Sequence, residues 1–540
     1  MEVADTRVAD FITEARNALG AEFVLEKALA QAFEQCVSGH SRRIAAVVQA
    51  RDIPQIRIVL QLCKKFELGL YPVSQGKNWG MGSRLPVQNG CVVLDLSGMS
   101  KIAHIDPVFG TITLEPGVTQ QQVYEHLLQE NLPFYMDVTG SSRESSVIGN
   151  LLERGVAYNT LRVDQLVQLE VMLADGSIVK TGFGEAPNSL VSHLYPHGLG
   201  PNLTGIFLQS NFGIVISATL TLLPKQESHF VFIANIRETR MVANVIDDLR
   251  LLLQQKILDC VVHVGNHKRR EITLAPLVFE AAKKYGVTLT RGECEGLVNR
   301  TSRGDWSAVG VIAGNRHCVK AHKKIVQKTL GAYGKVGWLT AEKLRIAKNA
   351  MRLIGLKRQL IFLEAVTPLL GYALGKPSSE ALRSAYWPFC NEQANWQNPD
   401  FPSDGGLIFC TPLLPMCSSA IEKFHQITQE FERTYLVKFA ITLNTMNRSC
   451  IEAVISLEFD RQNADTVQRT KTIMTNLLEQ CAAEGFLPYR LDIDSYRKFC
   501  NNHTELSRTS QRIKQLLDPD GIIAPGRYGL SAGPRDARAC

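Results

Sequence analysis

Short apolar runs separated by glycine-rich turns follow a polar leader in the first part of the chain. Residues 1–40 carry charge throughout and predict helix, with Leu29, Phe33 and Cys36 on part of an apolar face. Between residues 44 and 73 the pattern predicts a strand, an amphipathic helix over 54–66 and a second strand. Later apolar runs predict strands over 90–96 and 214–223, a hairpin over 105–114, and a second hairpin whose strands 166–173 and 178–181 are joined by an Asp-Gly turn. The region up to Pro224 is therefore expected to be rich in strands and poor in long helices.

After Pro224 helices and strands alternate. The apolar spacing predicts helices over 240–254, 277–285, 320–330, 418–433 and 463–484, and strands over 258–264, 306–313, 407–415, 438–443 and 451–459. Two strand–helix–strand units of this kind predict one antiparallel sheet covered by helices. The segment 386–404, rich in Trp, Asn and Pro, predicts a long loop. The expected fold class is α+β.

Composition narrows the functional classes. A chain of 540 residues is long enough for two or three domains, and 45% hydrophobic with 21% charged residues is typical of a globular protein. The net charge of +7 is spread without a basic run that includes aromatic residues, which argues against nucleic acid as a partner. No apolar run approaches the ~20 residues that span a bilayer, and no secretory signal precedes residue 20. The 13 cysteines form no C-x-x-C pair, which predicts reduced thiols in a cytoplasmic protein and no metal site.

Residues 72–82 place three glycines and an asparagine directly after a predicted strand. An ordinary tight turn explains these glycines, and so does a nest of backbone amides that binds an anion. The spacing matches neither the P-loop nor the Gly-x-Gly-x-x-Gly dinucleotide signature. A second small-residue segment spans 137–158, and a third spans 198–215. Each predicts either a solvent loop or a close approach of the backbone to a ligand.

Together these segments resemble the vanillyl alcohol oxidase and p-cresol methylhydroxylase family of flavoproteins. GKNWGMG at 76–82 and IGNLLERGVAY at 148–158 are similar to the family's two loops on the FAD pyrophosphate, and 92–102 and 115–127 are similar to segments between them. The stretch 198–215 resembles the end of the FAD domain, and DPDGIIAPGRYG at 518–529 resembles the C-terminal signature. The resemblance implies a helical leader over 1–40, a PCMH-type FAD domain of two small α+β subdomains over 41–225, a cap domain over 226–484 and a segment over 485–540 that returns to the FAD domain.

The resemblance also implies which residues bind FAD. They are Pro72, Ser74, Gly76, Lys77, Asn78, Trp79, Gly80, Met81, Gly82, Pro116, Gly117, Ser146, Gly149, Asn150, Gly155, Gly205, Asn211, Gly213, Ile214, Val215 and Arg527.

The catalytic residues that the resemblance implies begin with Tyr489 and Arg490, which match the family's phenolate-binding pair. An arginine keeps its charge and stabilises an anionic phenolate. Asp137 matches the loop of the family's catalytic aspartate, and His193 or His197 is an alternative base. Asp492 is a candidate partner that orients Arg490.

Several positions depart from the family's pattern. Met81 replaces a tyrosine that helps to hold the phenolate, and no histidine pair occurs near Cys450 and Ile451. Leu407 stands at the place of the histidine that attaches FAD covalently, and no tyrosine occurs between Tyr386 and Tyr435. These departures predict non-covalent FAD.

The sequence therefore predicts an FAD-dependent oxidoreductase that removes a hydride from a small-molecule substrate and passes the electrons to oxygen or to a separate acceptor. The sequence leaves three classes of substrate open: a para-substituted phenol, another alcohol or a biosynthetic intermediate. A catalytically degenerate flavoprotein that serves as an assembly or regulatory subunit is the alternative. Relatives of this kind are often dimers, so a homodimer is possible.

Overall fold

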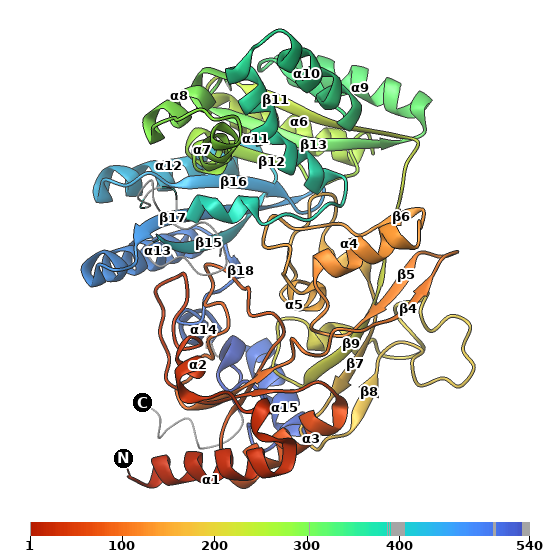
Figure 1. The fold of residues 1–540 in the computed structure, drawn as a ribbon, viewed down its shortest axis with the longest axis vertical. Helices are drawn as coiled ribbons and strands as arrows, with labels where there is room; N and C mark the ends of the chain where they lie inside the picture. The colour runs from red at the N-terminus through yellow and green to blue at the C-terminus, as the bar shows by residue number, and fades with distance from the viewer. Residues whose placement is uncertain are drawn as a thin grey trace.

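The computed structural model describes residues 2–531 except 302, 386, 388, 390–404 and 501–503. The loop predicted over 386–404 lies almost entirely outside these residues. Within the described residues the strands form four sheets, of which three contain more than two strands. Figure 1 shows a large sheet with its helices above, and two smaller sheets below it.

The first small sheet is parallel and has the order β1-β3-β2, formed by Ile44–Gln49, Cys91–Asp95 and Leu70–Val73. All five residues of β3 are buried, because α1 (Glu2–Leu19) and α3 (Ile53–Lys65) pack over this part of the core. The α3 helix begins at Asp52, whose side chain accepts a hydrogen bond from the backbone N–H of Gln55.

The second small sheet is antiparallel and has the order β4-β5-β9-β7-β8. Its strands are Ile102–Asp106, Thr111–Leu114, Ile214–Thr221, Leu166–Met172 and Ile178–Lys180. The α4 helix (Gln120–Gln129) starts with a capping box at Thr119, and the short α5 helix (Val147–Leu152) starts at Ser146. The two predicted hairpins of this region are present. A two-stranded pair joins β6 (Phe134–Tyr135) to β10 (Leu223–Pro224).

The large sheet has the order β14-β11-β13-β12-β16-β17-β15-β18, and every pair of neighbouring strands is antiparallel. We call it the cap sheet. In that order its strands are Val336–Leu339, Ser228–Ile236, Trp306–Gly314, His263–Asn266, Ala440–Thr445, Cys450–Asp460, Gly405–Pro415 and Pro488–Arg490. The sheet confirms the predicted α+β fold with one antiparallel sheet covered by helices.

The cap sheet has two differently covered faces. On the outer face, apolar side chains pack against α6 (Val242–Gln254), α9 (Arg316–Gly331), α12 (Ser418–Tyr435) and α13 (Ala464–Ala483). The inner face turns toward α7 (His267–Lys284) and α11 (Lys357–Ala373), with α8 (Arg291–Thr301) and α10 (Ala341–Leu353) packed behind them. No helix within the described residues has the length and apolarity needed to cross a membrane.

After β18 the chain lies against the two small sheets, as the blue α15 helix (Glu505–Leu517) shows in Figure 1. Ile523 bridges to Leu70 of β2. Behind this contact lies a fully buried ion pair, in which Nζ of Lys514 is 2.6 Å from Oδ2 of Asp518. Nζ also donates to the carbonyl oxygen of Asn211. The boundaries 41–225, 226–484 and 485–540 remain our proposal for the domain organisation.

Sequence patterns did not predict β11, β14, α8, α10 or α11. The α11 helix is apolar around most of its surface, because one side lines a cavity and others pack on α7 and α10. The strand predicted over 258–264 begins only at His263, because Val261 instead donates its N–H to the carbonyl oxygen of Asn159.

Candidate active site

A cavity of about 800 Å³ lies between the small sheets and the inner face of the cap sheet. Loops that follow the strands of the small sheets form its floor. The inner face of the cap sheet, with α7 and α11, forms its ceiling.

Most of the residues predicted to bind FAD lie on the floor. Those that line the cavity are Pro72, Ser74, Gly76, Lys77, Asn78, Trp79, Met81, Pro116, Ser146, Gly149, Asn150, Asn211, Gly213, Val215 and Arg527. The others do not line it: Gly80, Gly82, Gly117, Gly155, Gly205 and Ile214. Ile214 is buried in the core of the parallel sheet, and Gly205 lies in a short 3₁₀ turn.

Gly149 lines the cavity and Gly117 does not, and both show how closely the segments of the floor approach one another. A Cβ added to Gly149 would lie 2.5 Å from Oγ of Ser74, which joins the second loop to the first. A Cβ added to Gly117 would lie 2.3 Å from the backbone oxygen of Ser97. Since real Cβ atoms do not approach backbone this closely, Gly117 must be glycine for the two segments to meet, whereas at Gly149 the hydroxyl of Ser74 would have to move.

The floor fits an FAD. Its loops offer backbone amides and small hydroxyl side chains, the groups that bind a pyrophosphate without basic side chains. On the floor, Nε1 of Trp79 and Oδ1 of Asn211 are buried polar atoms without a hydrogen-bond partner among the described residues, and Nε of Arg490 faces the same cavity without one. A polar cofactor would satisfy such atoms.

Arg527 and Glu153 close the floor at the C-terminal segment. They form an ion pair, and the hydroxyl of Tyr528 donates to the other oxygen of Glu153, Oε2, over 2.6 Å. Burial raises the pKa of Glu153, but Arg527 and these hydrogen bonds hold the pKa below its ordinary value. The carboxylate therefore stays charged and fixes Arg527 at the cavity.

The ceiling is built from two rows of facing residues across the cap sheet. One row runs Ile233–Val309–His263–Asn444–Glu452 and the other runs Asn235–Ser307–Gly265–Thr442–Val454. Every one of these residues lines the cavity. The rows are two residues apart on each strand, because alternate side chains of a strand point to the same face.

Three polar residues of the first row are hydrogen-bonded to one another. Nδ1 of His263 lies 2.8 Å from Oδ1 of Asn444, and Nδ2 of Asn444 donates to Oε2 of Glu452 over 3.1 Å. Burial raises the pKa of Glu452, while Asn444 and Arg490 oppose the rise. Burial also lowers the pKa of His263, so the imidazole is neutral at pH 7. A carboxyl group in this setting is suited to taking and releasing a proton.

Arg490 reaches the cavity from β18, at the end of the ceiling next to Glu452. Its Nη2 donates to Oδ1 of Asn78 in the first loop. Tyr489 does not line the cavity, and its hydroxyl donates to the backbone oxygen of Arg154. Asp492 receives hydrogen bonds from Asp494 and Ser495, so Asn78 rather than Asp492 orients the guanidinium.

Asp137 is fully buried and does not line the cavity. Its carboxylate accepts hydrogen bonds from the backbone and side chains of Asn159 and Thr160, at 2.7–3.1 Å. Burial raises the pKa of Asp137, and Arg162 and these hydrogen bonds oppose the rise. These contacts give the carboxylate a role in holding the turn that carries Asn159. The predicted alternatives, His193 and His197, lie in an exposed loop and also do not line the cavity.

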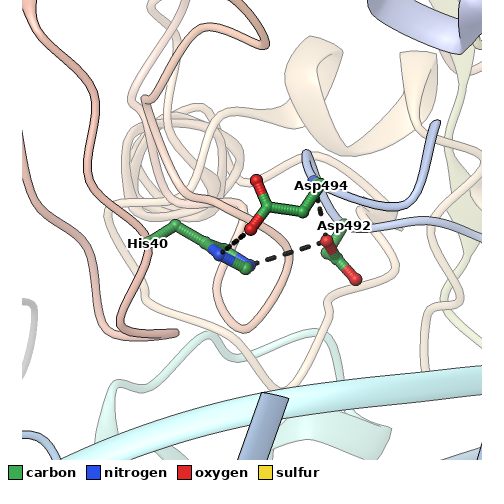
Figure 2. A group of neighbouring side chains, drawn as sticks. All are labelled: His40, Asp492 and Asp494. Carbon is green, nitrogen blue, oxygen red and sulfur yellow. Dashed lines mark hydrogen bonds and ion pairs between the residues drawn. The ribbon is translucent and has the colours of Figure 1, made fainter. Parts of the chain in front are cut away.

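A cluster behind Arg490 ties its segment to the chain before β1. Figure 2 shows the imidazole of His40 between the carboxylates of Asp494 and Asp492, with Nδ1 2.9 Å from the former and Nε2 3.6 Å from the latter. These groups are close enough to share a metal ion. Arg42 and Lys471 both pair with Asp494 and supply its countercharge. The cluster therefore acts as a clamp on the segment that follows Arg490.

Sequence reasoning did not identify Glu452, Asn444 and His263. One signal was present, because Glu452 and Glu458 place charged side chains within a mostly apolar strand. A charged residue on a buried strand is expected only where it is paired or functional.

The fold and the floor loops define an FAD-binding protein with a cap over its cofactor. Residues 44–182 match the model of the FAD binding domain. The chain is 28% identical to 1'-carboxy-chondrochloren decarboxylase of Chondromyces crocatus, over 95% of this chain and 96% of that protein. It is 25% identical to the 4-cresol dehydrogenase [hydroxylating] flavoprotein subunit of Pseudomonas putida, over 90% of this chain and 88% of that protein.

Solved structures agree on the fold. The structure of p-cresol methylhydroxylase with substrate bound matches with a TM-score of 0.81 and 24% identity, over 97% of both chains. The isoeugenol complex of 4-ethylphenol oxidase from Gulosibacter chungangensis matches with a TM-score of 0.83 and 22% identity, over 98% of both chains. The chain is therefore an FAD-dependent oxidoreductase that is similar over nearly its whole length to proteins of the vanillyl alcohol oxidase and p-cresol methylhydroxylase family.

Proposed function

We propose that the protein oxidises a para-substituted phenol, removing a hydride from the carbon next to the ring while Arg490 holds the phenolate oxygen. The observation that carries this proposal is the position of Arg490 on the cavity wall, where Asn78 fixes one end of the guanidinium and the buried Nε lacks a protein partner. Two of the similar proteins are named for p-cresol or 4-cresol, and a third for 4-ethylphenol.

Bound FAD would supply the hydride acceptor. The protein's own residues supply charge and a proton acceptor. Arg490 stabilises the negative charge of the phenolate oxygen and orients the ring. Glu452, whose pKa burial raises, takes the phenolic proton at a carboxylate oxygen, and the phenolate formed in this way at Arg490 then loses the hydride. Asn444 donates to the same carboxylate and keeps it directed into the cavity.

This proposal moves the role of proton acceptor from Asp137 to Glu452. The oxygens of Asp137 are occupied by the turn at Asn159 and Thr160, whereas Glu452 lines the cavity. Tyr489 receives a positioning role, since its hydroxyl holds the second loop at Arg154.

We further propose that FAD binds without a covalent link. Leu407 occupies the position of the family's attaching histidine and lines the cavity. Among the described cavity-lining residues, His263 is the one histidine, and its Nδ1 is engaged by Asn444. Acid precipitation tests this directly: the flavin band is expected in the supernatant, and a yellow pellet would contradict the proposal.

Anaerobic mixing of the purified yellow protein with para-alkyl phenols tests the function. We expect 4-alkyl phenols to bleach the flavin band, and their methyl ethers to leave it unchanged because they carry no phenolic proton. Bleaching by benzylic alcohols that lack a phenolic hydroxyl, at the same rate, would contradict the role of Arg490. Comparison of oxygen consumption with dye reduction then decides whether oxygen or a separate acceptor takes the electrons.

A further inference from the structure

Arg270 places a second guanidinium on the wall of the same cavity. It lies in the first turns of α7, and only 8% of the residue is exposed. Its Nη2 donates to the carbonyl oxygen of Gly304 over 2.7 Å. Its Nε and Nη1 are buried and have no hydrogen-bond partner among the described residues. Buried guanidinium donors are costly to leave unpaired, so they indicate a missing acceptor.

The neighbouring arginine behaves differently. Nη2 of Arg269 donates to the carbonyl oxygen of Ala440 and to Oγ of Ser456, and Glu458 supplies its countercharge. The acid that faces Arg270 is Asp305, and Oδ2 of this residue already accepts from the backbone and hydroxyl of Thr239. Arg269 therefore has one terminal nitrogen bound to the sheet, a countercharge and a single unpartnered donor, Nε, whereas Arg270 keeps two donors, Nε and Nη1, for an acceptor in the cavity.

Arg270 belongs to the end of the cavity that is remote from Glu452. Polar side chains gather on this part of the lining, from β11, β13, α7 and α8: Asn235, Ser307, Thr273 and Thr301. Ser307 lies on β13, three strands from the β17 strand that carries Glu452. At a spacing of ~4.8 Å between strands, the two ends are about 14 Å apart. Between them α11 presents apolar side chains, including Phe362, Leu363 and Val366.

We propose that Arg270 binds a carboxylate at the end of the substrate remote from the reacting carbon. The inference rests on the proposed function and narrows it. The substrate would be a phenol whose para side chain passes under α11 and ends in a carboxylate. Its phenolate would lie at Arg490 and its carboxylate would satisfy Nε and Nη1 of Arg270. Two cationic ends joined by an apolar middle select a substrate by both its charge and its length.

Matched substrates test this proposal. A 4-hydroxyphenyl-alkanoic acid, its primary amide and its methyl ester have the same reacting carbon and differ only in the remote group. For the wild-type enzyme we expect kcat/KM for the acid to exceed that for the amide by about 10- to 100-fold, mostly through KM, because hydrogen bonds to charged groups have this strength. Arg270→Met is expected to reduce this ratio to about 1.

The control variant is Lys268→Met, which removes a positive charge from the same helix but pairs with Glu271 rather than lining the cavity. It is expected to keep the preference for the acid. Equal loss of preference in both variants would overturn the proposal, since a general field effect would then explain it. If Arg270→Met loses its flavin, Arg270→Lys decides instead: a variant that binds flavin but has a smaller preference for the acid supports the proposal, and one that binds flavin with the full preference overturns it.

A binding measurement separates this inference from the proposed function. The acid should perturb the flavin absorbance band or protect the protein from thermal unfolding under anaerobic conditions even where no turnover occurs, and Arg270→Met should weaken that binding by about 10- to 100-fold. If no phenol bleaches the flavin but the acid binds through Arg270, the proposed function fails and the anion site stands. Release of one CO₂ for each flavin reduced would overturn the inference, because the carboxylate would then lie at the reacting carbon.

Discussion

The floor and the ceiling of the cavity are built on opposite principles. The floor consists of a few continuous segments whose glycines let backbone approach backbone, as Gly117 approaches Ser97. The ceiling consists of single side chains from many strands, such as Asn444 and Glu452, which meet only because the cap sheet sets their register. A wall built from backbone tolerates the loss of one hydroxyl but not the addition of a methyl group. A wall built from side chains is expected to tolerate an added methyl group but not the loss of one polar group.

The largest expected effect comes from adding one methyl group to the floor at Gly117. In Gly117→Ala the new Cβ would meet the backbone oxygens of Ser97 and Met99 at 2.3 and 2.7 Å, and backbone cannot rotate away. We expect loss of bound FAD and destabilisation of about 3 kcal/mol or more. Absorbance and thermal unfolding measure both.

Gly205→Ala is the matched control, because Gly205 belongs to the same sequence-predicted set and an added Cβ there meets nothing within 4 Å. It should retain flavin. Equal retention by both variants would show that the floor is not limited by the approach of its backbone.

The second effect tests the ceiling through Glu452. Glu452→Gln keeps an oxygen that accepts from Asn444 but removes the proton acceptor. We expect turnover of a para-alkyl phenol to fall by about 10²- to 10⁴-fold while FAD stays bound. Anaerobic flavin reduction in a stopped-flow instrument measures the chemical step. A variant that reduces flavin at the wild-type rate would exclude Glu452 as the base.

The same substitution has a predicted effect on stability. Because burial raises the pKa of Glu452, the folded state binds a proton more tightly than the unfolded state. The carboxyl group of Glu452 has a pKa of about 4.3 in the unfolded chain and a higher pKa in the folded protein. As the pH rises between these two pKa values, ionisation of this group lowers the free energy of unfolding. Glu452→Gln removes this slope, so the variant should be more stable than wild type at pH 7 and should lose that advantage below about pH 4. Urea unfolding at both pH values decides the sign.

The contrast between the two walls also explains which parts of the site can be predicted from the sequence and which cannot. The floor loops were found because 72–82 and 148–158 are contiguous and carry their geometry in glycine content. The cap sheet followed from alternating apolar runs such as 407–415 and 451–459. Sequence analysis did not identify His263 and Glu452, because they are 189 positions apart in the sequence and come together only through the register of β12, β16 and β17. Tyr489 and Arg490 are adjacent in sequence, but a strand directs them to different neighbours.

Asn78 joins the two walls and gives a further prediction. It belongs to the floor loop, yet its side chain accepts a hydrogen bond from Arg490. In Asn78→Ala the backbone of the loop is kept and the guanidinium loses its fixed partner. We expect kcat/KM for a para-alkyl phenol to fall by about tenfold, in line with one lost hydrogen bond to a charged group, with FAD affinity nearly unchanged. A large loss of FAD affinity instead would mean that this side chain serves the cofactor.

The smallest effect is expected from removing a floor hydroxyl. Oγ of Ser146 accepts from the N–H of Gly149 over 2.9 Å and donates to the carbonyl oxygen of Pro116 over 2.6 Å. Ser146→Ala should therefore cost about 1 kcal/mol of stability, the usual value for a helix N-cap. The backbone amides of the loop remain, so the protein should still bind one FAD, with a dissociation constant raised less than about tenfold. Fluorescence titration of the apoprotein measures this constant. A loss of FAD binding as complete as that expected for Gly117→Ala would mean that the hydroxyl, not the backbone, forms the floor, and the distinction between the two walls would fail.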